Sequence, residues 1–397
     1  MTATADKTLD TGTAYGRKPG VHDPLMTEVG PGTPMGELLR RYWHPVGLST
    51  DANAIPRQVR VLGEDLILFR DGTSRPGLVY PNCMHRGTSL YYGKVEERGI
   101  RCCYHGWLFD VEGHCVEQPC EPEMGRVRDR VRQPWYPVQE RYGLVWAYLG
   151  PPGKKPVLPR YDALERLDAG EFLEANDSSI GGGGPQIIDF NWLQHYENLV
   201  DHFHVVVLHS TFSGIQFIEQ LAQMPEVTWD TVALGVRTTS VRKLPDGKVL
   251  RRRSQAAIPT MRVIPNPRVA RYGRHESLGW ILPMDDHHFR IYVVGRVTEK
   301  GALKKRRSRM GGRLWEELTE AEHQIMPGDY EAMVSQGRIA MHSEEHLATS
   351  DRGIVMLRRF LKEQLERVQR GEDPVGVSFD PDAPPVVFDA GNFLEDA

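Results

Sequence analysis

The chain has 397 residues, of which 40% are hydrophobic and 26% charged, a composition typical of globular proteins and a length that favours two domains or one large one. No apolar run approaches the roughly 18–20 residues that a membrane-spanning helix needs, and a formal net charge of −4 argues against a dedicated nucleic-acid-binding protein. Residues 1–20 are polar and lack the apolar core of a signal peptide, so we expect a flexible arm in a cytoplasmic protein.

The first elements predict a short helix followed by a small all-β domain at residues 44–153. Thr33 is a suitable N-cap and Pro34 a suitable first helical residue, so a helix is expected that ends before Pro45. Short β-rich runs bounded by turn residues then follow, up to a Gly-Pro-Pro-Gly linker at 150–153. The clearest of these runs are 59–62 and 66–69, flanking Gly63-Glu64-Asp65, and 144–149.

The remaining residues, 154–397, predict a larger α+β domain with a mostly antiparallel sheet covered by helices. The last predicted helix is amphipathic, with Leu357, Leu361 and Leu365 on one face. The expected helices lie at 190–208, 316–340 and 354–370, and the expected strands at 227–241, 256–263 and 278–297.

The five cysteines fall within a short segment of a chain without a secretion signal, which favours metal binding over disulfides. Two tight pairs each combine one cysteine with one histidine: Cys83 with His85, and Cys102 with His105. Zinc fingers usually pair Cys with Cys and His with His. Mixed pairs suit a [2Fe–2S] cluster in which one iron takes two thiolates and the other two imidazoles, as in Rieske centres.

The residues around these pairs fit a cluster held between two hairpin loops. Gly87 and Gly106 permit tight turns, and Trp107 could shield one side of the cluster. The other three cysteines are expected to be free thiols, and the one beside Cys102 is expected to be packed. They are Cys103, Cys115 and Cys120.

A second group of possible metal ligands, histidines and carboxylates, lies within one otherwise apolar segment. Its histidines, His204 and His209, are five positions apart. On a regular helix this is a rotation of roughly 500°, which leaves the two side chains roughly 140° away from pointing in the same direction. The helix must therefore distort or end between them if both rings are to reach one metal. Nearby Glu197, Asp201 and His202 also need partners or a metal if they are buried. Two histidines and one carboxylate are a common ligand set for ferrous iron. Spacing allows Asp201 either to ligate the ion or to accept a hydrogen bond from the far nitrogen of His204.

These motifs resemble the Rieske non-haem iron oxygenases, in particular the phthalate 4,5-dioxygenase-like group. The likeness covers nearly the whole chain. The matching segments are Gly30–Gly36, Gly63-Glu64-Asp65, His85-Arg86-Gly87, Tyr104-His105-Gly106-Trp107, Gly150-Pro151-Pro152, Asn198–His209 and Ala348–Arg359. The resemblance implies an N-terminal arm and helix at 1–43 that pack on the catalytic domain, an iron–sulfur domain at 44–153 and a catalytic domain at 154–397.

The resemblance also implies roles for residues. Asp201 would bridge the iron ligand His204 of one subunit to the cluster ligand His105 of its neighbour in a homotrimer, and Asn198 would lie near the iron. The carboxylate ligand beside His204 and His209 would be Asp329, which matches the family segment that supplies it. Its competitors are Glu331, Asp285 and Asp286.

The implied activity is that of a terminal oxygenase. It would use O2 and electrons from a separate flavin-containing NAD(P)H-dependent reductase or a ferredoxin to hydroxylate an aromatic, carboxylated substrate. O- or N-demethylation of a methoxylated or methylated aromatic compound is an alternative, and a pure electron-transfer Rieske protein is a rival of another class. Two basic runs, 251–253 and 304–307, could be solvated or could dock an acidic partner. Possible partners for a substrate carboxylate are Arg262, Arg268, Arg271 and Arg274, which could equally face solvent.

Overall fold

The computed structural model describes residues 14, 16–126, 128–177, 180, 183–269, 271–305 and 312–396. Most of the expected N-terminal arm, half of a four-glycine segment at 181–184 for which the sequence predicts a loop, and half of the basic run at 304–307 lie outside these residues. Among the described helices, none is both long and apolar enough to cross a membrane.

The N-terminal helix forms where its cap predicts. Helix α2 (Pro34–Leu39) begins after Thr33, whose hydroxyl accepts the backbone N–H of Gly36. It follows α1 (Pro24–Thr27), which is capped by Asp23. The backbone N–H of Asp23 donates to Nδ1 of His342, 3.1 Å away, so this segment lies against the C-terminal half of the chain.

Residues 43–148 form three small antiparallel sheets joined by loops. The hairpin predicted around residue 63 is present, with Leu62 and Gly63 as its two positive-φ turn residues. The sheets are β1 (Trp43–Leu48), β10 (Leu144–Tyr148) and β9 (Val138–Arg141); β2 (Arg57–Val61), β3 (Glu64–Arg70) and β4 (Pro76–Val79); and β5 (Lys94–Glu96), β6 (Gly99–Arg101), β7 (Leu108–Phe109) and β8 (Cys115–Glu117).

The second half of the chain is built on a nine-stranded antiparallel sheet, which agrees with the predicted α+β class. The run predicted as one strand at 227–241 is instead a hairpin that turns just before Gly235, at φ 148°. In spatial order the strands are β11 (Phe172–Asn176), β18 (Phe289–Val297), β17 (Ser277–Pro283), β15 (Met261–Val263), β14 (Lys248–Ala257), β13 (Gly235–Lys243) and β12 (Glu226–Val232). Strand β19 (Gly391–Asp396) pairs with β14 and with β16 (Gly273–Arg274).

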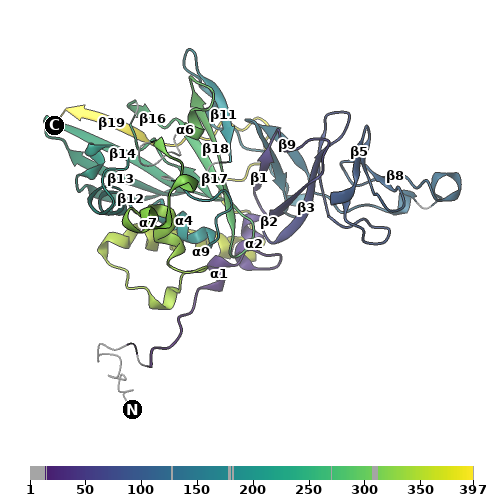
Figure 1. Cartoon of the computed structure of the whole chain (residues 1–397), viewed down its shortest axis with the longest axis horizontal. Coiled ribbons are helices and arrows are strands. Elements are labelled where there is room, and N and C mark those ends of the chain that lie inside the picture. The colour runs from purple at the N-terminus through teal and green to yellow at the C-terminus, as the bar shows by residue number, and fades with distance from the viewer. Residues whose placement is uncertain are drawn as a thin grey trace.

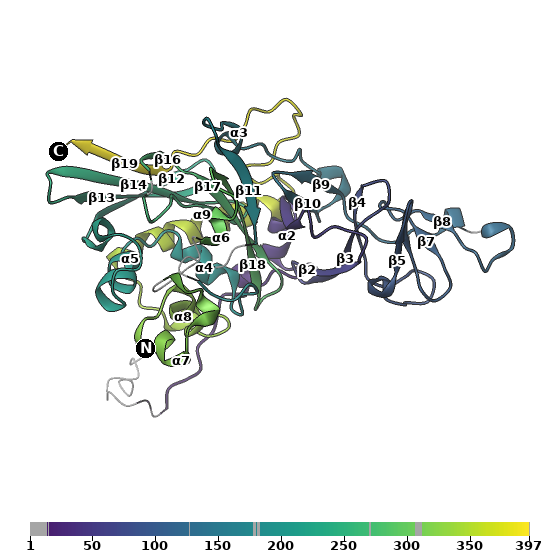
Figure 2. The same cartoon turned by 45° about the horizontal axis from the view of Figure 1, so that its top comes forward.

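The helices lie mainly on one face of this sheet (Figures 1 and 2). Helix α9 (Arg352–Gln369) matches the predicted amphipathic helix and buries Leu357, Leu361 and Leu365. Two long helices were predicted wrongly as continuous. Residues 190–208 divide into α4 (Trp192–Asn198) and α5 (His204–Val206), and residues 316–340 into α7 (Glu320–Ile325) and α8 (Asp329–Val334). The other helices are α3 (Asp162–Glu165), α6 (Ala302–Lys305) and the 3-10 turns Leu90–Tyr92, Pro122–Met124, Arg128–Arg130, Pro152–Lys154, Glu219–Ala222, Trp315–Glu317, His342–Glu344 and Thr349–Asp351.

Two hydrophobic cores divide the protein unequally. The larger one joins β1, β2 and β10 to the nine-stranded sheet, and Trp146 meets Trp280 edge-on with ring centroids 5.0 Å apart. The smaller one lies under the loops that carry Cys83 and Cys102. In Figure 2 the lobe that contains β5, β7 and β8 projects from one end of the molecule, while α5 lies near the other.

Candidate functional site

The two Cys/His loops have the same backbone construction. In the first, the N–H of Cys83 donates to Thr88 and the N–H of Gly87 donates back to Cys83. In the second, the N–H of Cys102 donates to Trp107 and the N–H of Gly106 donates back to Cys102. Gly87 and Gly106 both take positive φ, 76° and 73°, as the tight turns require. The shared spacing of four positions from cysteine to glycine therefore produces the same loop twice, although the histidine follows the cysteine by two positions in the first loop and by three in the second.

Within these loops the thiols lie inside and the imidazoles lie toward solvent. Cys83 and Cys102 are buried, and burial raises the pKa of the Cys83 thiol to about 12. The part-exposed rings of His85 and His105 lie with centroids 4.5 Å apart, and His85 stacks on Trp107 at 4.4 Å.

This arrangement fits a two-iron cluster better than a zinc ion. Tetrahedral zinc, with bonds of about 2.0–2.3 Å, brings all its donor atoms within about 4 Å of one another. Among the described residues, only His204, His209 and Asp329 offer at least three donor atoms that all lie within 4.8 Å of each other. The Cys/His quartet is not such a group among the described residues, and its mixed pairs allow one iron to take the two thiolates and the other the two imidazoles.

The remaining cysteines are free thiols, as predicted. One detail was wrong: Cys103 is exposed and not packed, because the residue after Cys102 points out of the small core. Cys115 is buried in that core, and Cys120 is exposed, with Sγ 3.6 Å from the carbonyl oxygen of His105.

The second group of possible metal ligands lies where the predicted helix is interrupted. Helix α4 ends at Asn198, and after α5 the chain continues as a π-helix over Val207–Phe212. In a π-helix the hydrogen bonds run from residue i to i+5, so residues five apart lie on one side. The rings of His204 and His209 consequently lie side by side in an edge-to-face arrangement, with centroids 5.5 Å apart. The expected distortion between these residues is confirmed.

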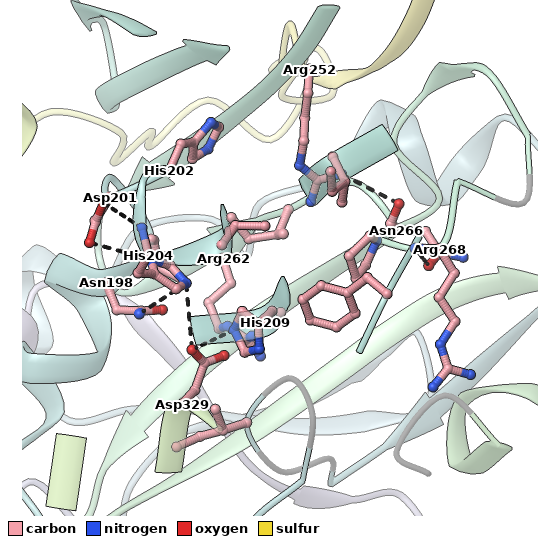
Figure 3. A pocket seen from close by; sticks show the side chains of 18 of the residues that line it. Asn198, Asp201, His202, His204, His209, Arg252, Arg262, Asn266, Arg268 and Asp329 are labelled. Atoms are coloured by element: carbon pink, nitrogen blue, oxygen red, sulfur yellow. Dashed lines mark hydrogen bonds and ion pairs between the residues drawn. The ribbon is translucent and has the colours of Figure 1, made fainter. Parts of the chain in front are cut away.

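Asp329 completes a three-residue cluster from a distant part of the chain. It is the first residue of α8 and is buried. Its Oδ1 lies 3.0 Å from Nε2 of His209 and 3.5 Å from Nε2 of His204 (Figure 3). Burial would raise the pKa of the Asp329 carboxyl, but His209 and His204 hold it well below its ordinary value.

The far nitrogens of both rings have their own partners. Nδ1 of His204 lies 3.4 Å from Oδ2 of Asp201, whose Oδ1 accepts the backbone N–H groups of Phe203 and His204. Asp201 thus faces the ring nitrogen turned away from Asp329. Nδ1 of His209 lies 2.8 Å from Oε1 of Gln216, a residue that the sequence analysis missed because a lone glutamine carries no motif.

Other predicted residues occupy varied positions. Nδ2 of Asn198 lies 3.4 Å from Nε2 of His204, whereas Glu197 pairs with Arg358 and lies outside the three-residue cluster. His202 lies 2.7 Å from the hydroxyl of Ser254. The competing carboxylates bind elsewhere. Glu331 accepts the N–H groups of Gly328 and Trp315, Asp285 pairs with Arg60 and His288, and Asp286 accepts the N–H of Val29.

A cavity of about 200 Å³ opens beside the cluster, and Asn198, Asp201 and His202 also line it. Of the four arginines considered as carboxylate partners, Arg262 and Arg268 reach this cavity. Arg271 pairs with Glu171 and Glu276, and Arg274 pairs with Asp168, so neither lines it. Arg252 also lines the cavity although its neighbours in the basic run, Arg251 and Arg253, pair with surface carboxylates.

Comparison with known proteins agrees with both parts of the structure. A family model described as the Rieske [2Fe-2S] domain matches residues 42–137. The phenoxybenzoate dioxygenase subunit alpha of Ectopseudomonas oleovorans is 51% identical over 386 residues, covering 96% of this chain and 94% of that protein. The 5,5'-dehydrodivanillate O-demethylase oxygenase subunit of a Sphingobium strain is 32% identical, covering 90% of this chain and 82% of its own.

The fold also has solved counterparts. The structure titled Pseudomonas putida CBB5 NdmA QL mutant with caffeine matches with a TM-score of 0.62 and 19% identity, over 88% of this chain and 99% of that one. The resemblance predicted from the sequence is thereby confirmed. The chain belongs to the Rieske non-haem iron oxygenases and is an oxygenase component that carries a Rieske [2Fe–2S] domain and receives electrons from a separate reductase.

Proposed function

We propose that this oxygenase holds one ferrous ion with His204, His209 and Asp329 and uses it to hydroxylate a carboxylated aromatic compound. The observation that carries the proposal is the convergence of these three donors within 4.8 Å at the wall of the cavity. Two imidazoles and one carboxylate leave coordination positions open, so a bound ferrous ion would supply O2 activation there. The relatedness to the phenoxybenzoate dioxygenase subunit supports a carboxylated aromatic substrate.

The residues behind the ligands orient them. Oε1 of Gln216 accepts a hydrogen bond from Nδ1 of His209, and Oδ2 of Asp201 forms a charge contact of 3.4 Å with Nδ1 of His204. Both contacts leave the Nε2 atoms turned toward Asp329. His209 is 1% exposed, so its ring has little freedom to turn away. The Rieske cluster would be held by Cys83, His85, Cys102 and His105.

Electrons would pass between subunits through Asp201. Within one chain the cluster loops and α5 lie toward opposite ends (Figure 2), so an electron has no short path inside the monomer. The Asp201 side chain is 31% exposed and available to the part-exposed His105 of a neighbour. Exposed apolar side chains surround both places, as a subunit contact requires. They are Met84, Tyr91, Tyr92 and Tyr104 near the cluster, and Val207, Phe212, Ile215 and Met224 near α5. We propose a head-to-tail homotrimer with a domain boundary near residue 153.

Oxidative O-demethylation is the second candidate, and the relative named as an O-demethylase oxygenase subunit favours it. Both reactions would use the same three ligands and the same electron path. They differ in which substrate atom lies over the open side of the metal site.

The deciding experiment combines metal analysis with a substrate screen. The purified holoprotein should contain about three iron atoms per chain, two in the cluster and one in the ligand triad. With a surrogate reductase and NADH, phenoxybenzoate, phthalate and methoxybenzoates should be assayed by mass spectrometry for added oxygen or lost methyl. About two irons per chain and no oxidised product would favour an electron-transfer protein instead.

A further inference from the structure

Arg262 stands apart from the other cations of the cavity by its position in the sheet. It is the middle residue of β15, whose neighbours Met261 and Val263 are buried in the main core. Because side chains alternate along a strand, Arg262 points to the opposite face, where it lines the cavity. Figure 3 shows its side chain in the same cavity as His204, His209 and Asp329.

Small residues on the adjacent strands leave room for this side chain. Arg262 is the register partner of Ala256 on β14 and of Gly279 on β17. A Cβ on Gly279 would lie 3.4 Å from Cβ and 3.6 Å from Cδ of Arg262, so the side chain runs over the glycine. The Arg262 side chain thus extends across Gly279 and lines the cavity, where a ligand can contact its guanidinium.

The Arg262 guanidinium lies in the field of the Asp329 carboxylate but makes no hydrogen bond or ion pair with any described residue. Within the described residues its Nε is buried without a hydrogen bond, and no ion pair joins it to a carboxylate. Arg252, by contrast, donates to the carbonyl oxygens of Pro265 and Asn266 and to Oδ1 of Asn392. Both cavity aspartates, Asp201 and Asp329, are engaged with histidines.

A guanidinium whose Nε is buried without a hydrogen bond carries a desolvation cost that an anion bound in the functional state would offset. Burial lowers the pKa of Arg262 only to about 10, which leaves it charged at neutral pH. A guanidinium can bind both oxygens of a carboxylate through two parallel N–H donors. Apolar side chains that could hold an aromatic ring line the same cavity, namely Leu199, Val205, Phe217, Leu221, Ile264 and Val293.

We propose that Arg262 is the substrate-anchoring residue, which binds the carboxylate of an aromatic acid and thereby selects which part of the ring faces the ligand triad. This inference rests on the proposed function and adds the residue that binds the carboxylate of the substrate. Its consequence is selectivity for acids over otherwise identical neutral compounds, and that selectivity is located in one side chain.

The test is equilibrium binding to the full-length holoprotein under anaerobic conditions, measured by calorimetry with phenoxybenzoate and with its neutral amide. The wild type should prefer the acid, and Arg262→Gln should weaken acid binding by about 10- to 100-fold while changing amide binding less than about threefold. Arg262→Lys should recover only part of the loss because it cannot form the paired hydrogen bonds. Arg251→Gln is the matched control, since it removes the same charge from a residue of β14 that pairs with Glu395 at the surface.

The outcomes separate this inference from the proposed function. Equal affinity for acid and amide in the wild type, or unchanged acid affinity in Arg262→Gln, would overturn the anchoring role even if turnover of an aromatic compound is normal. Failure of the proposed function would appear as a missing third iron and absent turnover, which the binding comparison does not require. A folded Arg262→Gln cavity is recognised by retained binding of the neutral amide.

Discussion

Replacing Gln216 with methionine tests whether the residue behind His209 controls metal affinity. Oε1 of Gln216 lies 2.8 Å from Nδ1 of the His209 ring, which is 1% exposed, so no water can readily replace the lost acceptor. Leaving a buried N–H without a partner costs about 1–3 kcal/mol, or roughly 5- to 150-fold in an equilibrium constant. This range agrees with the roughly 10- to 100-fold loss of metal affinity typical when such a supporting contact is removed.

The assay is anaerobic titration of Fe(II) into protein whose cluster is intact and whose third iron has been removed. Gln216→Met should raise the dissociation constant within that range and leave cluster absorbance unchanged. Gln216→Glu is the control, because its carboxylate still accepts from Nδ1 and should keep affinity near the wild type. If Gln216→Met binds Fe(II) as tightly as the wild type, Gln216 does not orient His209 and the reasoning fails.

Three further outcomes are expected. Asp201→Asn should keep all the iron but lower turnover by about 100-fold, the upper end of the loss of activity usual when a residue that supports a metal ligand is replaced. Normal single-turnover and steady-state rates would contradict its bridging role. Asp329→Ala should lose about one iron per chain, whereas Glu331→Gln should lose none, and equal metal contents in the two variants would show that the carboxylate is misassigned. Burial lowers the pKa of His44 from 6.5 to about 4, so its contribution to stability is present above pH 6.5 and falls by about 3 kcal/mol as the pH drops to 4. The difference in denaturation free energy between wild type and His44→Gln should narrow over that interval, and a constant difference would contradict the assignment.

The sequence indicated the two Cys/His loops because the residues that define them are close together in the chain, and the match to the Rieske domain agrees with them. The Cys83 and Cys102 loops each carry their ligands within four residues, and turn glycines mark both. The five-residue spacing of His204 and His209 likewise required a distortion, and the structure has one. The carboxylate Asp329 lies 120 residues later, so only resemblance to known proteins could suggest it.

The errors have physical causes that can be identified. The prediction of one long helix at 316–340 overlooked two local signals. A capping box at Thr319 and Glu322 starts a helix at residue 320, and Pro327-Gly328 separates that helix from the next one. The break after Asn198 is not marked by proline or glycine, and a long-range contact lies there: the indole N–H of Trp229 donates to the carbonyl oxygen of Val200. Arg262 could not be separated from its neighbours, since its direction depends on a three-residue strand whose register is decided by the sheet.

The wide turn at Val207–Phe212 accommodates one residue more than an ordinary helical turn would. The hydroxyls of Ser210 and Thr211 donate to the carbonyls of Val205 and Val206, five positions back, and so help to satisfy this loosened backbone. Deleting Val207 would therefore allow a regular α-turn in which the two histidines, now four apart, still share a face. Everything downstream would rotate by about 100°, which would carry Gln216 away from the imidazole it supports. The extra residue thus allows two conditions to be met together: the rings of His204 and His209 lie side by side, and Gln216 still contacts the ring of His209.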